Sequence, residues 1–284
     1  MLFLIGLTAF SIILTKTEKA GAADGITIPL SVSYNSTYWW RGVELNGRNV
    51  GVLWLGVGAE LGDTGLALQF FSALSQDYLV QSDESTTAYK NYNNTQKSLT
   101  EFDYGISYAK EIEGLVNIEA ALYYIQYAFY DEVNSSAVNP SFIEASLALE
   151  MATILSPKIS LYYDYYVDER IGTDGKETPV NQDYYLNFSL SQTLLEAQGF
   201  RFGLSAWVGY YNNAYLEAEG WSDTGINAAF SFESGDTSFE GSFNYARSLS
   251  SDFQLEYTET DYPNNSVGVL KNHLWITFGV TYKI

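Results

Sequence analysis

The last twelve residues of the chain alternate apolar and polar side chains without interruption. The even positions of His273–Ile284 carry Leu274, Ile276, Phe278, Val280, Tyr282 and Ile284, and the odd positions carry His273, Trp275, Thr277, Gly279, Thr281 and Lys283. A period of two is the period of a β-strand, because successive side chains of a strand point to opposite sides. This segment therefore predicts a strand with one face suited to lipid and the other suited to a polar interior.

The same alternation returns along the chain in segments of roughly 9–13 residues separated by polar connections. The other predicted strands are Ile28–Tyr34, Leu53–Leu61, Leu66–Phe70, Phe102–Tyr108, Val116–Tyr124, Ile143–Met151, Ile159–Val167, Tyr184–Leu190, Phe202–Tyr210, Ile226–Phe232 and Phe239–Tyr245. Together with the C-terminal segment they make about twelve strands, an even number, as bacterial single-chain barrels have.

The connections between these segments alternate between short and long. Short polar turns fall near Gly62–Thr64, Glu111–Gly114, Ser156–Pro157, Glu196–Gly199 and Ser234–Asp236. Longer polar loops fall at Arg41–Asn49, Ser75–Ser98, Asp131–Pro140, Asp168–Asn181, Tyr211–Ser222 and Ser250–Val269. Short periplasmic turns and long extracellular loops are typical of outer-membrane barrels. We therefore expect an all-β protein, a single transmembrane antiparallel β-barrel in the cell outer membrane with both termini periplasmic.

A water-soluble barrel shows the same alternation with the faces reversed, so periodicity does not distinguish the two. The sorted loop lengths favour the membrane barrel, and so do aromatic residues near the predicted strand ends. Aromatic rings favour the membrane interface, where an apolar body and a polar tip are both satisfied. The residues expected there are Trp39, Trp40, Tyr123, Tyr124, Tyr127, Tyr130, Tyr162, Tyr163, Tyr165, Tyr166, Tyr210 and Tyr211.

The N-terminal segment is typical of an export signal. Leu2–Leu14 is apolar and shorter than a membrane-spanning helix, and Ala20-Gly21-Ala22 fits a cleavage site. No Lys or Arg precedes the apolar stretch, which departs from the usual pattern, and a single-pass anchor is the alternative. We expect residues 1–22 to be a signal peptide and residues 23–284 to form the barrel. Elsewhere no apolar run reaches the ~18 residues of a membrane helix.

The charge balance is strongly acidic and argues against binding to nucleic acid. Lys and Arg number 14 against 34 Asp and Glu, and removal of residues 1–22 takes away Lys16, Lys19 and Glu18. The mature chain then has 12 basic and 33 acidic groups, a net charge of −21. Such a field repels phosphate backbones. An aromatic content of 16% argues against disorder, in which aromatic residues are scarce.

Strand parity directs a set of charged side chains into the barrel. The residues predicted to line a pore are Arg41, Glu119, Glu144, Glu150, Asp164, Asp183, Arg201 and Glu240; Glu101 and Asp103 also point inward, and Arg247 lies near a strand end. An acidic excess along a narrow water path raises the local cation concentration. The predicted function is therefore passive diffusion of small hydrophilic solutes, neutral or cationic. Alternatively, the charges pair with one another or with Arg201 and plug a closed barrel.

Arg41 allows two interpretations of its own. Its guanidinium contacts a solute at the outer constriction, or it meets a carboxylate at the rim or a lipopolysaccharide phosphate while the neighbouring tryptophans anchor the interface. The long polar loops are expected to be solvated surface, with divalent-cation binding as the alternative. Outer-membrane lipid, lipopolysaccharide and small hydrophilic solutes are the expected partners, and the sequence leaves monomer and trimer open. A non-conducting surface protein with ligand- or adhesion-binding loops is the alternative function.

An enzyme is not expected. His273 is the one histidine and cysteine is absent, so neither a His/Cys cluster nor a thiolate metal site is encoded. A lipid hydrolase on a barrel needs a histidine with a serine or an acidic partner, and His273 is predicted to face inward at the outer end of the last strand. No catalytic residue, metal or other cofactor is predicted.

Two segments resemble known patterns. The C-terminal strand 273–284 resembles the signal by which outer-membrane barrels are passed to the barrel-assembly machinery, although Ile284 replaces the usual terminal aromatic. Tyr38-Trp39-Trp40-Arg41-Gly42 follows a first strand and precedes Val52–Gly58 and Gly65–Ser72. This order resembles the opening of the TorF-type putative porins, over about the first fifth of the chain. The resemblance implies an outer-membrane barrel with a channel-like role.

Overall fold

The computed structural model describes residues 25–37, 39–41, 43–44, 51–75, 100–128, 141–166, 170–171, 177–178, 182–213, 218–250 and 272–284. The predicted signal peptide, residues 1–22, lies outside these ranges, as do most of the predicted long loops. Among the described residues, no helix is both long and apolar enough to cross a bilayer.

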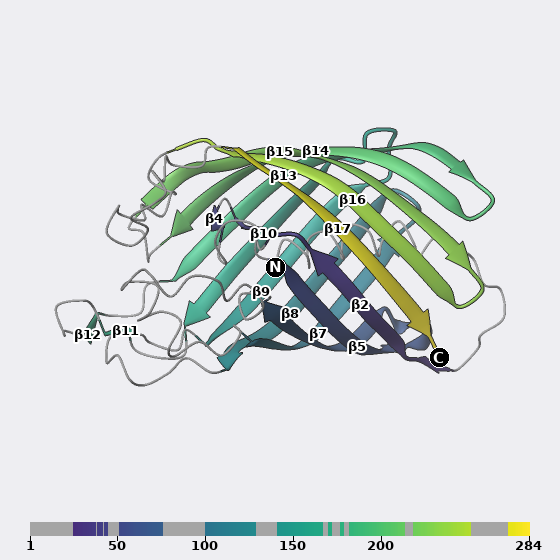
Figure 1. Cartoon of the computed structure of the whole chain (residues 1–284), viewed down its shortest axis with the longest axis horizontal. Helices are drawn as coiled ribbons and strands as arrows, with labels where there is room; N and C mark the ends of the chain where they lie inside the picture. The colour runs from purple at the N-terminus through teal and green to yellow at the C-terminus, as the bar shows by residue number, and fades with distance from the viewer. Residues whose placement is uncertain are drawn as a thin grey trace, which may run out of the picture.

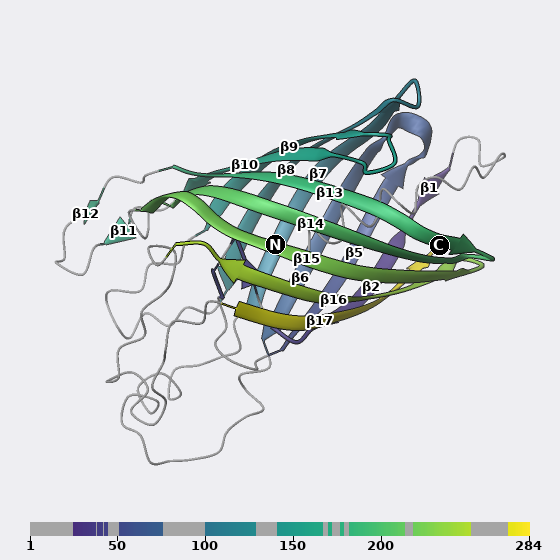
Figure 2. The same ribbon diagram turned by 90° about the horizontal axis from the view of Figure 1, so that it is seen from above.

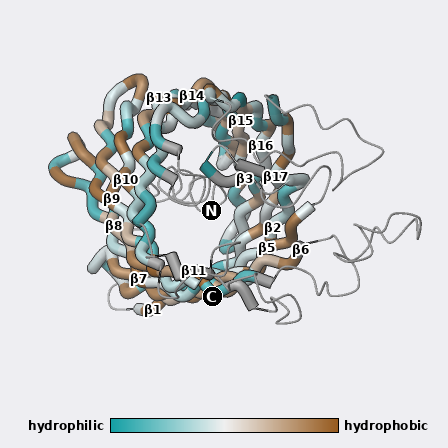
Figure 3. The backbone as a smooth tube through the Cα atoms, turned by 90° about the vertical axis from the view of Figure 1, so that its left-hand side faces the viewer, coloured by the Kyte–Doolittle hydropathy of each residue, from teal (hydrophilic) through white to brown (hydrophobic). Residues whose placement is uncertain are grey.

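Within the described residues, twelve antiparallel strands close into one barrel (Figures 1 and 3). They are β2 (Pro29–Asn35), β5 (Val52–Leu61), β6 (Leu66–Ser75), β7 (Thr100–Ile112), β8 (Val116–Ala128), β9 (Phe142–Met151), β10 (Lys158–Tyr166), β13 (Asp183–Ala197), β14 (Phe200–Asn213), β15 (Ala218–Ser234), β16 (Thr237–Ser248) and β17 (Asn272–Lys283). Each pairs with the next, and β17 pairs with β2 to close the ring. The predicted fold and strand number are confirmed.

Shorter strands accompany the barrel. β1 (Ile26–Thr27) extends the wall by pairing with the end of β5. Two small antiparallel pairs accompany the predicted loops. β3 (Trp39–Trp40), just before the predicted loop Arg41–Asn49, pairs with β4 (Val43–Glu44) inside it, and β11 (Arg170–Ile171) pairs with β12 (Glu177–Thr178) within the loop Asp168–Asn181. The first of these pairs carries Arg41 at its turn.

The short turns share one end of the barrel with the C-terminus (Figures 1 and 2). The turn from β5 to β6 contains a single 3-10 turn, η1 (Gly62–Thr64), and β13 and β15 return through residues 198–199 and 235–236. At the same end, the Ile28 amide donates to the Ile284 carbonyl at 2.9 Å and the Ile284 amide donates to Ile28 at 3.1 Å. The start and the end of the barrel wall are thus hydrogen-bonded together on the side of the short turns.

The predicted loop Tyr211–Ser222 is wrong in its extent. β14 continues to Asn213 and β15 begins at Ala218, with Tyr211 paired to Gly220 and Asn212 to Glu219. The hydrogen-bonded ladder extends through residues whose polar character suggested a loop, because backbone pairing between strands does not depend on apolar side chains.

An apolar belt covers the outside of the barrel. Each of the twelve strands exposes at least one large apolar side chain, for example Val32, Leu55, Leu68, Ile106, Leu122, Leu147, Leu161, Leu190, Leu204, Ile226, Phe243 and Phe278. Soluble monomers rarely expose a contiguous apolar area of more than a few hundred Å². A continuous belt of this kind is the surface that a barrel presents to lipid. The reversed arrangement of a water-soluble barrel is therefore excluded.

The aromatic residues predicted for the membrane interface divide between the two faces. Tyr124, Tyr163 and Tyr165 are exposed on the outside, as expected, whereas Tyr123, Tyr162 and Tyr211 are buried on the inner face. The prediction was wrong for these three because it grouped neighbouring tyrosines, and neighbours on a strand point in opposite directions. The side chains of Trp39, Trp40, Tyr127, Tyr130 and Tyr166 lie outside the described residues.

Candidate functional site

Three carboxylates lie side by side on the inner wall, near the end of the barrel that carries the long connections. Asp164 of β10 is the direct cross-strand partner of Glu144 on β9 and of Asp183 on β13. All three side chains are buried. Like charges placed directly opposite one another destabilise a sheet. This acidic row of Glu144, Asp164 and Asp183 is therefore stabilised by a cation placed next to it.

A row of tyrosines lies next to the acidic row, two residues further towards the short turns. Tyr162 of β10 pairs with Tyr185 of β13, and Tyr185 pairs with Tyr211 of β14. The ring centroids of Tyr162 and Tyr185 are 6.2 Å apart, and Tyr185 meets Tyr211 edge-on at 5.7 Å. The tyrosine row and the acidic row together form one polar and aromatic patch on the inner face of β9, β10, β13 and β14.

Arg41 reaches this patch from the far side of the barrel. Because Trp40 pairs with Val43, Arg41 occupies the first position of a two-residue hairpin turn between β3 and β4. Its φ of 48° is left-handed, a conformation that costs about 1 kcal/mol for a residue other than glycine. Arg41 follows β2, and five strands separate β2 from β10 in either direction round the ring. The hairpin therefore folds into the barrel and carries the arginine to the opposite wall.

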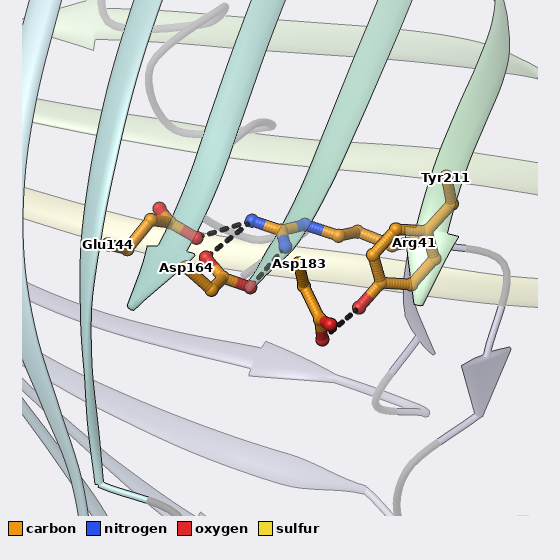
Figure 4. Close-up of polar contacts among 5 residues, drawn as sticks. All are labelled: Arg41, Glu144, Asp164, Asp183 and Tyr211. Carbon is orange, nitrogen blue, oxygen red and sulfur yellow. Dashed lines mark hydrogen bonds and ion pairs between the residues drawn. The ribbon is translucent and has the colours of Figure 1, made fainter. Parts of the chain in front are cut away.

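The guanidinium of Arg41 joins two members of the acidic row, Glu144 and Asp164, whereas Asp183 accepts a hydrogen bond from Tyr211 Oη at 3.4 Å (Figure 4). Both of its terminal nitrogens donate to the Asp164 carboxylate, Nη1 to Oδ2 and Nη2 to Oδ1, the second at 3.2 Å. Nη2 also donates to Glu144 Oε2 at 2.5 Å. Such two-pronged contacts between arginine and carboxylate are among the strongest hydrogen bonds in proteins. They tie the connection between β2 and β5 to the wall across the lumen.

The tyrosine row surrounds the same guanidinium with aromatic rings. The Arg41 Cζ atom lies 5.3 Å from the ring centroid of Tyr162 and 5.6 Å from those of Tyr185 and Tyr211. These distances are within the ~6 Å range of cation–π attraction. Burial disfavours the charged guanidinium, but the charges of Asp164 and Glu144 outweigh this and hold the pKa of Arg41 well above its ordinary value. Arg41 is therefore a fixed positive charge at this point.

Asp223 of β15 supports the tyrosine row. Its carboxylate accepts hydrogen bonds from Tyr185 Oη at 3.1 Å, from Trp207 Nε1 at 2.9 Å and from Ser222 Oγ at 2.7 Å. The register shifts here, because Gly209 pairs with Asp223 while Tyr210 pairs with Trp221, so Ser222 is the extra residue of a β-bulge. A bulge re-aims neighbouring side chains. Here it buries Ser222 together with Asp223, so that both lie beside Tyr185.

We expect Gly209→Ala to disturb the tyrosine row. A Cβ at Gly209 overlaps the ring of Tyr185 and the carboxylate of Asp223, and the cost of such overpacking is about 1–3 kcal/mol. The free energy of unfolding in urea measures it. The matched control is Gly279→Ala, because a Cβ there meets Glu240 Cγ and Ser33 Cβ at 3.2 Å, and a small movement relieves both contacts. Equal stability of the two variants contradicts the close packing of Tyr185 on Gly209.

Other predicted pore-lining residues lie elsewhere on the wall. Glu119 forms an ion pair with Lys158 at 2.9 Å, and Glu150 is the cross-strand neighbour of Lys158. Arg201 pairs with Glu196 at 2.8 Å near the short turns, where Glu196 is 59% exposed. Glu240 lies on β16 beside Gly279. The structure thus brings Arg41, Glu144, Asp164 and Asp183 together and leaves these four residues apart from them.

The sequence interpretation missed four members of the site and one cation on the wall. They are Tyr162, Tyr185, Tyr211, Asp223 and Lys158. Strand parity contained a usable signal for the tyrosines, because Tyr162 lies two residues from Asp164 and Tyr185 lies two residues from Asp183, which places them on the same face. Asp223 has the inward parity of Asn227 and Ser231 on the same strand, but the predicted strand began only at Ile226, so the parity was not carried back to it. Among the described residues, no group of three or more His, Cys, Asp or Glu is arranged to hold a metal ion.

Neither a protein-family model nor a curated protein sequence matches the chain, so the resemblance to the TorF-type family stays a prediction. Solved structures do match. NanC porin is 13% identical with a TM-score of 0.53, and the match covers 90% of this chain and 100% of NanC. KdgM porin is 10% identical, with a TM-score of 0.46 and coverage of 90% and 98%. The COG4313 outer membrane channel of Pseudomonas putida F1 is 10% identical, with a TM-score of 0.49 and coverage of 94% and 98%. The likeness to NanC shows that the two chains share a barrel fold.

Proposed function

We propose that this chain is an outer-membrane channel for the passive diffusion of small hydrophilic solutes, neutral or cationic, narrowed by Arg41 at the end that bears the long loops. The observation that carries the proposal is the sign of the charge on the inner wall. Among the described residues, the buried charged side chains are six carboxylates and one guanidinium: Glu101, Asp103, Glu144, Asp164, Asp183, Asp223 and Arg41. An acidic wall raises the local concentration of cations and lowers that of anions.

The outer surface and the fold support the same proposal. The apolar belt on all twelve strands suits the hydrocarbon of a bilayer, and NanC, which has the same fold, is a porin. We further propose that residues 1–22 are a removable leader, that strand 273–284 is the segment passed to the assembly machinery, and that the short turns and both ends of the wall face the periplasm.

Solute flux into liposomes tests the proposal. Liposomes containing the refolded chain are expected to swell rapidly in a neutral pentose and in the choline cation, and more slowly in an anionic sugar acid of similar size. A unit charge about 4 Å away contributes about 1 kcal/mol even at the dielectric constant of water, which corresponds to a roughly five-fold difference in rate. Protein-free liposomes are the control. Swelling no faster than theirs contradicts a channel.

One observation favours a second candidate, a non-conducting surface protein whose outer loops bind ligands. The hairpin after β2 is tied through Arg41 to Asp164 on the opposite wall, and a hairpin held there obstructs the lumen at that level. The flux assay separates the two functions when it is repeated with Arg41→Ala. A folded barrel that passes no solute either with or without the arginine favours the surface protein, whereas flux in both proteins favours the channel.

A further inference from the structure

We propose that the wall patch formed by the acidic row and the tyrosine row is a binding site for guanidinium groups of permeating solutes, and that Arg41 is an internal ligand occupying it. The proposal rests on the proposed function in one respect only, since solutes must be able to enter the barrel. It assigns a class of ligand to the inner wall: a planar organic cation that donates hydrogen bonds at its edge and presents an apolar face.

The hydrogen bonds match this class of ligand. Asp164 accepts from both terminal nitrogens of Arg41, and Glu144 accepts from Nη2 on the adjacent strand. The guanidinium group is planar and presents its donors in a fixed fork, which pairs with carboxylates in a way that a compact ammonium cannot. Two carboxylates in direct cross-strand register therefore select the geometry of a guanidinium as well as its charge.

The rings add a second and independent selection. Tyr162, Tyr185 and Tyr211 place three ring centroids at 5.3–5.6 Å from the guanidinium carbon. Aromatic cages of this kind are used to recognise organic cations, because the ring faces attract positive charge. Small, strongly hydrated ions gain less, because the rings do not compensate for the water molecules that such ions would lose. Sodium and potassium meet the acidic row but gain little from the tyrosine row.

The occupant and the site belong to separate parts of the fold. The patch is built on β9, β10, β13 and β14, and Asp223 of β15 accepts a hydrogen bond from Tyr185 in the middle of the tyrosine row. Arg41 comes from a two-residue turn after β2, on the opposite side of the ring. Removing the arginine side chain therefore leaves the strands that shape the site in place.

A solute guanidinium would use the acceptors that Arg41 now uses. These are the carboxylates of Glu144 and Asp164, which form ion pairs with Arg41. An incoming guanidinium solute is drawn to the row and competes with Arg41 for the same oxygens and rings. The solute can bind only while Arg41 is out of the site, so its apparent affinity is the intrinsic affinity multiplied by the fraction of molecules in which the site is vacant.

Calorimetric titration of the refolded barrel in detergent micelles with methylguanidinium chloride tests this inference. Arg41→Ala is expected to bind methylguanidinium about ten-fold or more tightly than the wild-type chain, because it lacks the internal competitor. N-Methylurea, which is neutral and similar in shape, and sodium chloride are not expected to compete for the site. Arg201→Ala is the matched control, because it removes an arginine from an ion pair near the short turns and should bind like wild type.

A double variant identifies the site. Arg41→Ala combined with Asp164→Asn should lose the gained binding while remaining folded, which the shift between folded and heat-denatured bands on a gel verifies. Equal, weak binding by the wild-type chain and Arg41→Ala overturns the inference. Because the titration needs no ion current, its result is separate from that of the flux assay: binding without flux contradicts the channel alone, and flux without binding contradicts the guanidinium site alone.

Discussion

Replacing Arg41 by alanine is expected to raise the preference of the barrel for cations over anions by about five-fold, since a unit charge some 4 Å from a passing ion contributes about 1 kcal/mol even at the dielectric constant of water. Arg41 supplies the positive charge beside Glu144 and Asp164. Without it, the acidic row acts on the permeating ion unopposed. The conductance should rise as well, because the hairpin is no longer tied to Glu144 and Asp164 on the opposite wall. The reversal potential in a salt gradient and the single-channel current measure the two effects.

Two further variants separate charge from shape in this prediction. Arg41→Lys keeps the positive charge but loses the planar guanidinium that donates to two acceptors at once, so its cation-over-anion selectivity should stay near that of the wild-type chain. Lys110→Ala removes a positive charge from an exposed position near the end of β7 and should leave both readings unchanged. An Arg41→Ala barrel with the selectivity and conductance of the wild type contradicts the position of the guanidinium in the path of ions.

Removing both Arg41 and Asp164 should destabilise the barrel by less than the sum of the single effects. A hydrogen bond that involves a charged group contributes about 1.5–3 kcal/mol, and the partner left alone carries a penalty of its own. We therefore expect a coupling free energy of that size between Arg41→Ala and Asp164→Asn in a double-mutant cycle. The free energy of unfolding in urea, measured for the four proteins in one lipid or detergent, gives the coupling.

The chain contains a control pair for this cycle. Arg201 and Glu196 also form an ion pair, at 2.8 Å, but Glu196 is 59% exposed. Exposed pairs of this kind contribute only about 0–1 kcal/mol. Arg201→Ala and Glu196→Gln should accordingly show weak coupling. A coupling between Arg41 and Asp164 no larger than that of the control pair means that the hairpin is not held to the opposite wall.

The barrel was predictable from the sequence because its physical constraints repeat in every strand. A strand between lipid and a polar lumen must alternate side chains, as His273–Ile284 does, and a ring must close with paired strands. Glycine, aspartate and proline marked the short turns, which the structure confirms at residues 62–65, 156–157 and 235–236. The loop at Tyr211–Ser222 was overestimated because polar, tyrosine-rich strand ends resemble loops in composition.

The inward direction of the carboxylates was also predictable, whereas their partner was not. Parity alone places Glu144, Asp164 and Asp183 on the inner face. The ion pairs of Arg41 join residues 103 and 123 positions apart in sequence, and they depend on a turn that folds into the barrel rather than away from it. No local pattern in Tyr38–Val43 specifies that direction. The inward direction of the hairpin is seen only in the closed ring, in which β10, the strand of Asp164, stands opposite β2.

The ion selectivity of the wild-type chain tests the account most directly. The refolded protein is inserted into a planar bilayer, and the single-channel conductance and reversal potential are measured in a potassium chloride gradient. The acidic inner wall predicts discrete channels with a reversal potential on the cation-selective side. A folded barrel that shows no conductance, or one that prefers chloride, contradicts the account.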